Sequence, residues 1–222
     1  DDGSVDGLIN GGVGSKRYRL TFTGPGGHSF GAFGLVNPMT AMSQAIVDLY
    51  KIPVPQSPKT TYSASVVGGG SSVNAIPQEV WLQVDMRSES AAELAKLEQA
   101  FLATVDKAVA TENGARSIKE GPIRVDKKVV GDRPAGSTTA DTALVRQTAA
   151  AYAAEGVTAR MSFSSTDANV PMSLGIPAIT IPRAATGGRG HSPDEWIDVS
   201  APESLKVKRM DLVALLAAAG YR

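Results

Sequence analysis

Four segments within the first 130 residues are predicted as β-strands, and in two of them, 17–23 and 78–87, apolar and polar positions alternate, which is the pattern of a strand with one buried face. They cover residues 17–23, 60–67, 78–87 and 123–130. Segment 78–87 shows the pattern most clearly, because Val80, Leu82, Val84 and Met86 all fall on one side. We therefore predict four strands in this part of the chain.

Two segments between these strands repeat apolar residues at helical spacing. The first begins after Asn37, an N-cap residue followed by Pro38, and runs to residue 50. The second begins at Ser90 and Glu93, which have the spacing of a capping box. The resulting order is strand, helix, strand, strand, helix, strand, which is typical of a ferredoxin-like α+β domain. We assign this domain to residues 16–130.

Residues 131–222 have a different pattern. Helical segments are expected at 139–154 and 202–219, and short apolar segments lie at 158–163 and 178–181. This alternation favours an α/β layer, but the few strands would leave an open sheet edge and an uncovered face. We therefore expect a partial α/β layer whose remaining strands lie outside this chain. The Gly-rich residues 1–14 are expected to form a loop, in a leading segment (1–15) from the same domain.

The amino-acid composition argues against several classes of function. Lys+Arg and Asp+Glu are 22 each, and this balance argues against nucleic acid as the main partner. No apolar run has the ~18–20 residues of a membrane span. Cysteine is absent, so a thiol nucleophile and Cys-ligated zinc are excluded. The lack of cysteine and of a signal segment favours a cytoplasmic location. The only imidazoles are those of His28 and His191.

One candidate site is a serine nucleophile. Ser29 lies in Gly-His-Ser-Phe-Gly, which matches the G-x-S-x-G pattern of a nucleophile elbow. With His191 and Asp194 or Asp198, a serine-hydrolase triad can be drawn. The elbow requires a strand that turns directly into a helix, however, and the next expected helix begins only after Asn37. A serine hydrolase is therefore an alternative rather than the main hypothesis.

A second candidate is a metal or catalytic imidazole. His191 ends a glycine-rich loop and precedes Asp194 and Glu195, so carboxylates could orient its ring. His28 follows two glycines, and Asn74 and Arg87 flank a predicted strand. Each of these residues alone is more often an ordinary surface residue than a site residue. Their combination is what points to function.

The motifs form an ordered series along the whole chain. They are Gly-Pro-Gly-Gly-His28, Gly-Gly-Gly-Ser-Ser-Val-Asn74-Ala-Ile-Pro77, Val-Asp85-Met-Arg87, Ser-Thr-Asp167-Ala-Asn, Gly175-Ile-Pro177 and Gly-His191-Ser-Pro-Asp-Glu195. This series resembles the di-zinc exopeptidase and aminoacylase family that includes carboxypeptidase G, peptidase T and succinyl-diaminopimelate desuccinylase. Residues 16–130 resemble its lid and dimerisation domain, and residues 131–222 resemble the C-terminal part of its catalytic domain.

The resemblance implies roles for four residues. In the family, the histidine that matches His28 reaches across a homodimer and steadies the oxyanion in the neighbouring site. The positions of Asn74 and Arg87 bind the carboxylate or backbone of the substrate, and the position of His191 ligates zinc. The implied reaction is amide hydrolysis of a peptide or N-acyl amino acid by a metal-activated water. A straight strand would hold Asn74 and Arg87 roughly 40 Å apart, so either the chain bends near Pro77 or the two residues serve different ends of the lid.

Several family motifs have no counterpart here. The His-x-Asp ligand pair and the Glu-Glu pair that includes the general base are both absent. Asp1 or Asp2 could match a further ligand, but a zinc site normally needs at least three. We therefore expect a fragment of a two-zinc hydrolase that is inactive by itself. The non-enzymatic alternative is a dimerisation module that pairs through an edge strand and a helix of the lid.

Overall fold

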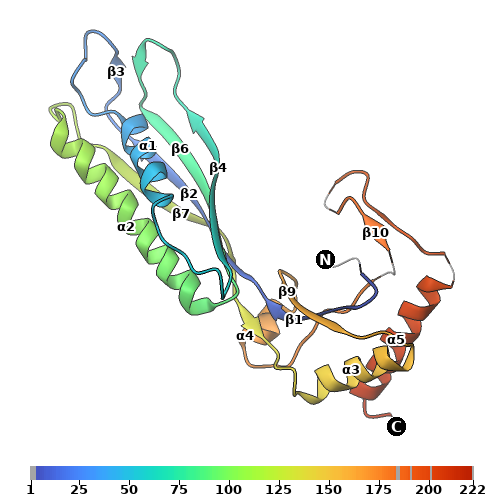
Figure 1. Ribbon diagram of the computed structural model, residues 1–222. Helices are drawn as coiled ribbons and strands as arrows, with labels where there is room; N and C mark the ends of the chain where they lie inside the picture. The colour runs from blue at the N-terminus through green and yellow to red at the C-terminus, as the bar shows by residue number, and fades with distance from the viewer. Residues whose placement is uncertain (1–3, 184–185, 191, 201, 222) are drawn as a thin grey trace. The chain divides into compact units, whose positions relative to one another are not determined.

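The computed structural model describes residues 4–183, 186–190, 192–200 and 202–221 (Figure 1). It divides the chain into two compact units. One consists of Ser15–Arg133, and the other combines Asp1–Gly14 with Pro134–Arg222. Each unit is described by itself below. Within the described residues, no helix is both long enough and apolar enough to cross a membrane.

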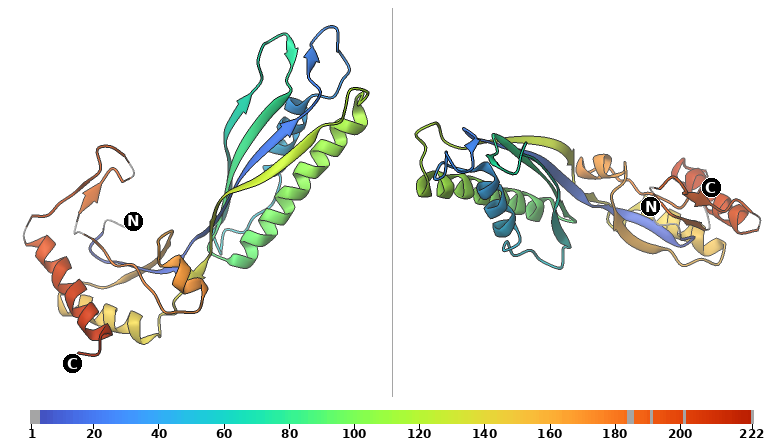
Figure 2. Two further views of the ribbon diagram at one scale, coloured as in Figure 1. Left: turned by 180° about the vertical axis from the view of Figure 1, so that it is seen from behind. Right: turned by 90° about the horizontal axis from the view of Figure 1, so that it is seen from above.

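The unit formed by residues 15–133 is built on a four-stranded sheet. The strand order is β4 (Thr60–Gly69), β6 (Glu79–Ser88), β2 (Gly14–Thr23) and β7 (Arg124–Arg133), with β4 antiparallel to β6 and β2 antiparallel to β7. Helices α1 (Pro38–Leu49) and α2 (Ala91–Ala115) cover one face of this sheet, and the other face is open (Figure 2). The predicted α+β ferredoxin-like element order is therefore confirmed.

Burial explains why these segments form strands and helices. On β6, Val80, Leu82, Val84 and Met86 are almost fully buried against the helices, while the residues between them reach the open face. Helix α2 buries Leu94, Leu97, Phe101 and Val105, which recur at helical spacing. Each buried side chain of this kind stabilises the fold by about 1.5–3 kcal/mol relative to exposure. The alternating pattern of the sequence thus reports one continuous core.

The helix ends match the predicted caps, with one correction. The side chain of Asn37 accepts a hydrogen bond from the backbone N–H of Met39 at 2.9 Å. At α2 the Ser90 hydroxyl accepts from Glu93 N–H at 3.3 Å, but the backbone N–H of Ser90 donates to the Ser88 hydroxyl instead of to Glu93. The reciprocal half of the predicted capping box is therefore not formed, because Ser88 already satisfies that donor.

The other unit contains a three-stranded sheet in the order β8 (Gly136–Ser137), β1 (Gly7–Gly12) and β9 (Arg160–Ser164). Strand β1 is central, antiparallel to β8 and parallel to β9. The prediction of a loop over residues 1–14 is therefore wrong for residues 7–12. Glycine is required there by close packing, since a Cβ on Gly11 would lie 2.3 Å from the Phe163 ring.

Short elements and helices complete this unit. They are α3 (Ala143–Ala154), α4 (Asn169–Ser173), β10 (Gly187–Gly188), β11 (Trp196–Ile197) and α5 (Glu203–Ala218). Residues 178–181, predicted as a strand segment, make only an isolated antiparallel bridge between Thr180 and Ile9. The fold of this unit is the partial α/β layer expected from the sequence.

Asn169 holds the loops of this unit together. Its side chain is fully buried, donates to the backbone carbonyls of Val13 and Pro134 at 2.9 Å each, and accepts from Thr166 N–H at 3.0 Å. Its amide thus satisfies backbone groups from three separate segments. The Ser-Thr-Asp-Ala-Asn motif therefore has a structural role through its last residue.

Candidate functional site

His28 lies in a two-stranded ribbon of the 15–133 unit. Strand β3 (Gly27–His28) pairs antiparallel with β5 (Ala75–Ile76), so that His28 faces Ala75 across the ribbon. The carbonyl of Asn74 accepts a hydrogen bond from Ser29 N–H at 2.9 Å. The glycine-rich turn and the Gly-Gly-Gly segment, about 45 positions apart in the sequence, thus meet here. Two of the four predicted site residues are brought together.

The hydrogen bonds of His28 determine its tautomer. The ring nitrogen Nδ1 accepts from the backbone N–H groups of Phe30 and Gly31 at 3.2 and 3.3 Å. A neutral imidazole has one donor and one acceptor nitrogen, so the proton belongs on Nε2. The side chain is exposed. His28 is therefore fixed as a hydrogen-bond donor through Nε2 and does not need a positive charge to donate.

A hollow of about 520 Å³ adjoins this ribbon, and its walls include His28, Asn74, Gln78 and Glu79. Gly69 closes one side. It has a φ of 109°, and a Cβ on it would lie 2.5 Å from the Glu79 carbonyl oxygen, so only glycine fits. The Ser72 hydroxyl is 2.6 Å from Oδ1 of Asn74 and donates to it. This contact orients the amide so that its NH₂ group remains free to donate.

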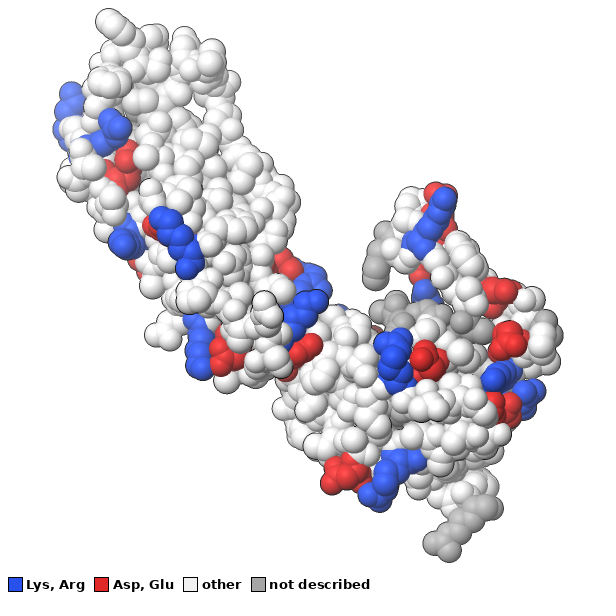
Figure 3. Space-filling model, in the orientation of Figure 1, with Lys and Arg blue, Asp and Glu red and all other residues white. Residues whose placement is uncertain are grey.

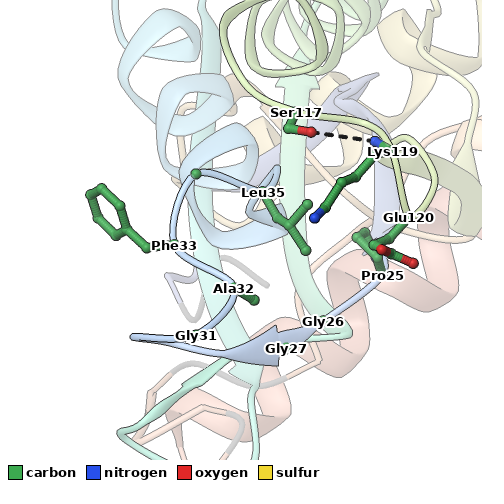
Figure 4. A pocket seen from close by; sticks show the side chains of 11 residues that line it. Pro25, Gly26, Gly27, Gly31, Ala32, Phe33, Leu35, Ser117, Lys119 and Glu120 are labelled. Carbon is green, nitrogen blue, oxygen red and sulfur yellow. Dashed lines mark hydrogen bonds between the residues drawn. The ribbon is translucent and has the colours of Figure 1, made fainter.

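A second hollow of about 590 Å³ lies between the turn that follows β3 and the turn at residues 117–120 (Figure 4). The side chain of Lys119 extends over it beside Leu35, and Glu120 lies near Pro25. Gly27 lines both hollows. Phe30 and Phe33, on the same turn as His28, are 89% and 85% exposed. The turn therefore presents apolar as well as polar groups.

Ser29 does not form a nucleophile elbow. Strand β3 is only two residues long, Ser29 begins a turn, and α1 does not start until Pro38. The strand-to-helix geometry that exposes a nucleophilic serine is thus not formed. His191, the base of the imagined triad, lies outside the described residues.

Arg87 occupies a different place from His28 and Asn74. It lies near the end of β6, whereas Asn74 precedes β5, which pairs with β3 rather than with the main sheet. Residues 77 and 78 separate β5 from β6, so there is a break in the strand near Pro77. The break does not bring the two residues together, because about 30 Å of strand β6 separates its two ends.

The Arg87 guanidinium belongs to an ion cluster on the open sheet face. Arg87 Nε donates to Oδ2 of Asp85 at 2.7 Å, and Arg17 Nε on β2 donates to Oδ1 at 2.7 Å. Partial burial raises the pKa of Asp85, but the hydrogen bonds and charges of Arg87 and Arg17 outweigh it, so the pKa lies below its usual range. Asp85 is therefore ionised at neutral pH.

Arg17 was not among the predicted site residues. A signal was present, since Arg17 and Arg19 occupy the polar face of an alternating strand. Nothing in the sequence pairs that strand with β6, however, and the partnership with Asp85 depends on this pairing. The contact joins residues 68 positions apart.

The predicted metal ligand cannot be placed. His191, together with Asp1 and Asp2, lies outside the described residues. Within the described part of the chain, no group of three or more His, Asp or Glu side chains could hold a metal ion. The described residues therefore do not themselves supply a zinc site.

A comparison with protein families identifies one part of the chain. Residues 10–113 match the family model described as a peptidase dimerisation domain, of the M20 type. The matched segment contains His28, Asn74, Asp85 and Arg87, and it ends within α2. It covers most of the 15–133 unit.

Solved structures share the fold of nearly the whole chain. An aminopeptidase from Bacillus cereus has a TM-score of 0.71 and 17% identity, over 99% of this chain and 54% of its own. A tripeptidase from Staphylococcus aureus has a TM-score of 0.72 and 17% identity, and the match covers 95% of this chain and 52% of the tripeptidase. An amidase of the hydantoinase/carbamoylase family from Burkholderia vietnamiensis has a TM-score of 0.69 and 21% identity, and the match covers 95% of this chain and 49% of the amidase. The chain thus spans about half the length of the structures that it resembles.

Proposed function

Because residues 10–113 form a peptidase dimerisation domain of the M20 family, we propose that this chain is part of a zinc-dependent exopeptidase or amidohydrolase. The substrate class is a peptide or an N-acyl amino acid, and the bond cleaved is an amide. The similar solved structures are named as peptidases and amidases, which supports a hydrolase. We place the enzyme in the cytoplasm.

The hydrogen bonding of His28 carries the proposal. Hydrolysis of an amide passes through a tetrahedral species with a negatively charged oxygen, which preorganised donors stabilise. His28 offers Nε2–H for this purpose, since two backbone N–H groups occupy Nδ1. Its role is therefore a donor to the oxyanion and not a general base. Removal of one such donor in other hydrolases reduces the turnover number by about 10²–10³.

Asn74 and Arg87 take complementary parts of the substrate in this proposal. The amide NH₂ of Asn74, oriented by Ser72, donates to a substrate carbonyl or carboxylate in the hollow beside His28. Arg87 engages one carboxylate oxygen of Asp85 through Nε, so its terminal N–H groups can receive an anionic group. Within one subunit, Asn74 and Arg87 lie too far apart to bind one small group together.

We propose that the active enzyme is a homodimer that pairs through β4. Strand β4 is an edge strand, and its sequence Thr-Thr-Tyr-Ser-Ala-Ser-Val-Val-Gly-Gly contains no charge. The opposite edge, β7, carries six charged residues among ten. Charges protect an exposed edge from pairing, so β4 is the edge that is free to pair.

The helix surface beside β4 is also mainly apolar, and the Lys51–Asp48 ion pair lies next to Tyr50 at its end. On α1, Met39, Ser43, Val47 and Tyr50 fall on one side at helical spacing. Met39, Val47 and Tyr50 are exposed, as are Val66 and Val67 on β4. Figure 3 shows uncharged surface where β4 lies in the upper part of the unit, whereas charged side chains gather on the α2 side. An edge strand and an apolar helix stripe together suit a second copy of the same surface.

Two observations support zinc in this proposal, namely the family resemblance and the presence of His191 at the position of a family ligand. The described residues do not assemble a set of metal ligands. We propose that the remaining ligands and the general base are contributed by residues outside this chain, consistent with its coverage of about half of each similar structure.

The test is His28→Ala in an enzyme that contains this chain and a complete catalytic domain. We expect kcat to fall by about 10²–10³ while the bound zinc per subunit is unchanged, since His28 donates to the oxyanion and is not a ligand. Ser29→Ala, one residue away, is the matched control and should retain activity. Both quantities are measured on the same preparation, by initial rates and by elemental analysis.

Parallel loss of zinc and activity in His28→Ala would contradict the oxyanion role, because it would make His28 a ligand or a structural residue. Loss of activity in Ser29→Ala, together with labelling of Ser29 by a fluorophosphonate, would instead favour the serine hydrolase. Full activity in both variants would show that neither His28 nor Ser29 takes part in catalysis.

A further inference from the structure

Arg17, Asp85 and Arg87 form a cluster of two positively charged guanidinium groups around one carboxylate. Each oxygen of Asp85 accepts from a different guanidinium, Oδ1 from Arg17 and Oδ2 from Arg87. Both guanidinium groups use Nε for this contact, and each distance is 2.7 Å. The cluster therefore has a net positive charge on the open face of the sheet.

Arg17 is held in place by its neighbours. It lies opposite Gly131 in the register of β2 and β7, and a Cβ on Gly131 would be 3.0 Å from Cδ of Arg17. Gly131 therefore has no side chain at the place where the stem of Arg17 lies. Arg19, two positions along β2, instead stacks over the Trp81 ring at 3.9 Å from its centroid. Of these two arginines, the described contacts place only Arg17 on Asp85.

The arrangement decides how Arg87 can bind the carboxylate. An arginine and a carboxylate without competitors favour a bidentate pair, in which Nε and one terminal nitrogen bind the two oxygens. Arg17 donates to Oδ1 and competes for that oxygen, and the contact that Arg87 makes with Asp85 in the described structure is the single one from Nε to Oδ2. Its terminal N–H groups are then not consumed within the cluster. They remain available for an anionic ligand over the open sheet face.

We propose that Arg17 is a positioning residue that keeps the terminal N–H groups of Arg87 free to bind the carboxylate of the substrate. The inference rests on the proposed function, because it assigns Arg87 a substrate with a free carboxylate, as in a peptide C-terminus or an N-acyl amino acid. Arg17 itself acts through Asp85 and need not contact the substrate.

The kinetic test compares two substrates that differ only in charge, an N-acyl amino acid and its carboxamide, in the enzyme with a complete catalytic domain. Arg17→Ala should raise KM for the acid about tenfold with little change in kcat, and should leave KM for the amide unchanged. Arg17→Lys should restore KM for the acid to within about twofold, since an ammonium group also occupies one oxygen of Asp85.

Equal effects of Arg17→Ala on both substrates would overturn the proposal and make Arg17 a structural residue. If Arg87→Ala also changes KM for the acid and for the amide equally, Arg87 does not bind the carboxylate, but the proposal that the enzyme is a hydrolase is unaffected. If the unmodified enzyme hydrolyses neither substrate nor any other member of a peptide and N-acyl amino acid panel, the proposed function fails first.

A second measurement on the chain itself does not depend on activity. In the NMR spectrum of the unmodified chain, the terminal N–H groups of Arg87 should rotate freely while its Nε–H is hydrogen-bonded. In Arg17→Ala they should become slowly rotating and separately resolved, as bidentate pairing demands, and in Arg17→Lys they should not. A bidentate Arg87 in the unmodified chain would overturn the proposal.

Discussion

Asp211 on α5 is the residue whose ionisation is most at odds with its surroundings. Burial raises its pKa to about 6 from 3.8, and within the described residues its Oδ1 is buried without a hydrogen-bond partner. The folded chain therefore holds a proton that the unfolded chain releases. Between about pH 4 and pH 6 Asp211 binds more protons in the folded state than in the unfolded state, so its own contribution to stability falls as the pH rises through this window.

Asp211→Asn removes that titration. A shift of about two pKa units corresponds to ~3 kcal/mol, and partial solvent contact reduces the expected gain to about 1 kcal/mol at pH 7.5. Urea unfolding at pH 4 and pH 7.5 measures it. The exposed Asp194→Asn is the control and should keep the slope of the unmodified chain. An Asp211→Asn chain that still loses the same stability between these pH values would contradict the assignment.

At the scale of elements, β4 and β7 provide a matched pair of edges. Val67 on β4 and Val129 on β7 are 56% and 45% exposed, and among the described residues neither strand has a neighbour on its outer edge. Val67→Lys should weaken dimerisation by about 100-fold or more, which is about 3 kcal/mol, because it buries a charge in the proposed pairing surface. Val129→Lys should leave the dimer unchanged. Sedimentation equilibrium distinguishes them.

If Val67→Lys and Val129→Lys weaken the dimer equally, β4 is not the pairing edge. If Val129→Lys alone produced monomers, the charged edge would be the interface, and the argument from the uncharged sequence of β4 would fail. A chain that is monomeric at tens of micromolar before any substitution would remove the dimer altogether.

The elements also show what sequence patterns can and cannot predict. Strands β2 and β6 followed from alternation and helices α1 and α2 from helical spacing, because each has one buried and one open face. The edge strands β4 and β7 were also predicted, although almost none of their residues is fully buried. Strand β1 was missed because both of its faces are buried and its glycines leave no alternation. Close packing against Phe163 and Asn169 requires these glycines, and that requirement is visible only in three dimensions.

At the scale of the whole molecule, the family resemblance and the α+β fold class are confirmed. The site residues were chosen by motif, and the structure groups them by surface. His28 and Asn74 share one hollow, and Arg87 lies with Arg17, which no motif marked. The roles of all four predicted site residues stay predictions. Pairing between distant strands decides which residues meet, and this pairing has no local signature.

We propose that His28 of one subunit serves the metal site that includes His191 of the other, as the family resemblance implies. The most direct test mixes two inactive variants of the complete enzyme, His28→Ala and His191→Ala, under conditions where the subunits exchange. Half of the resulting dimers are mixed, and each mixed dimer has one site with both histidines, so about one quarter of full activity should return. If His28 acts within its own subunit, no site is repaired and the mixture stays inactive, which would contradict the account.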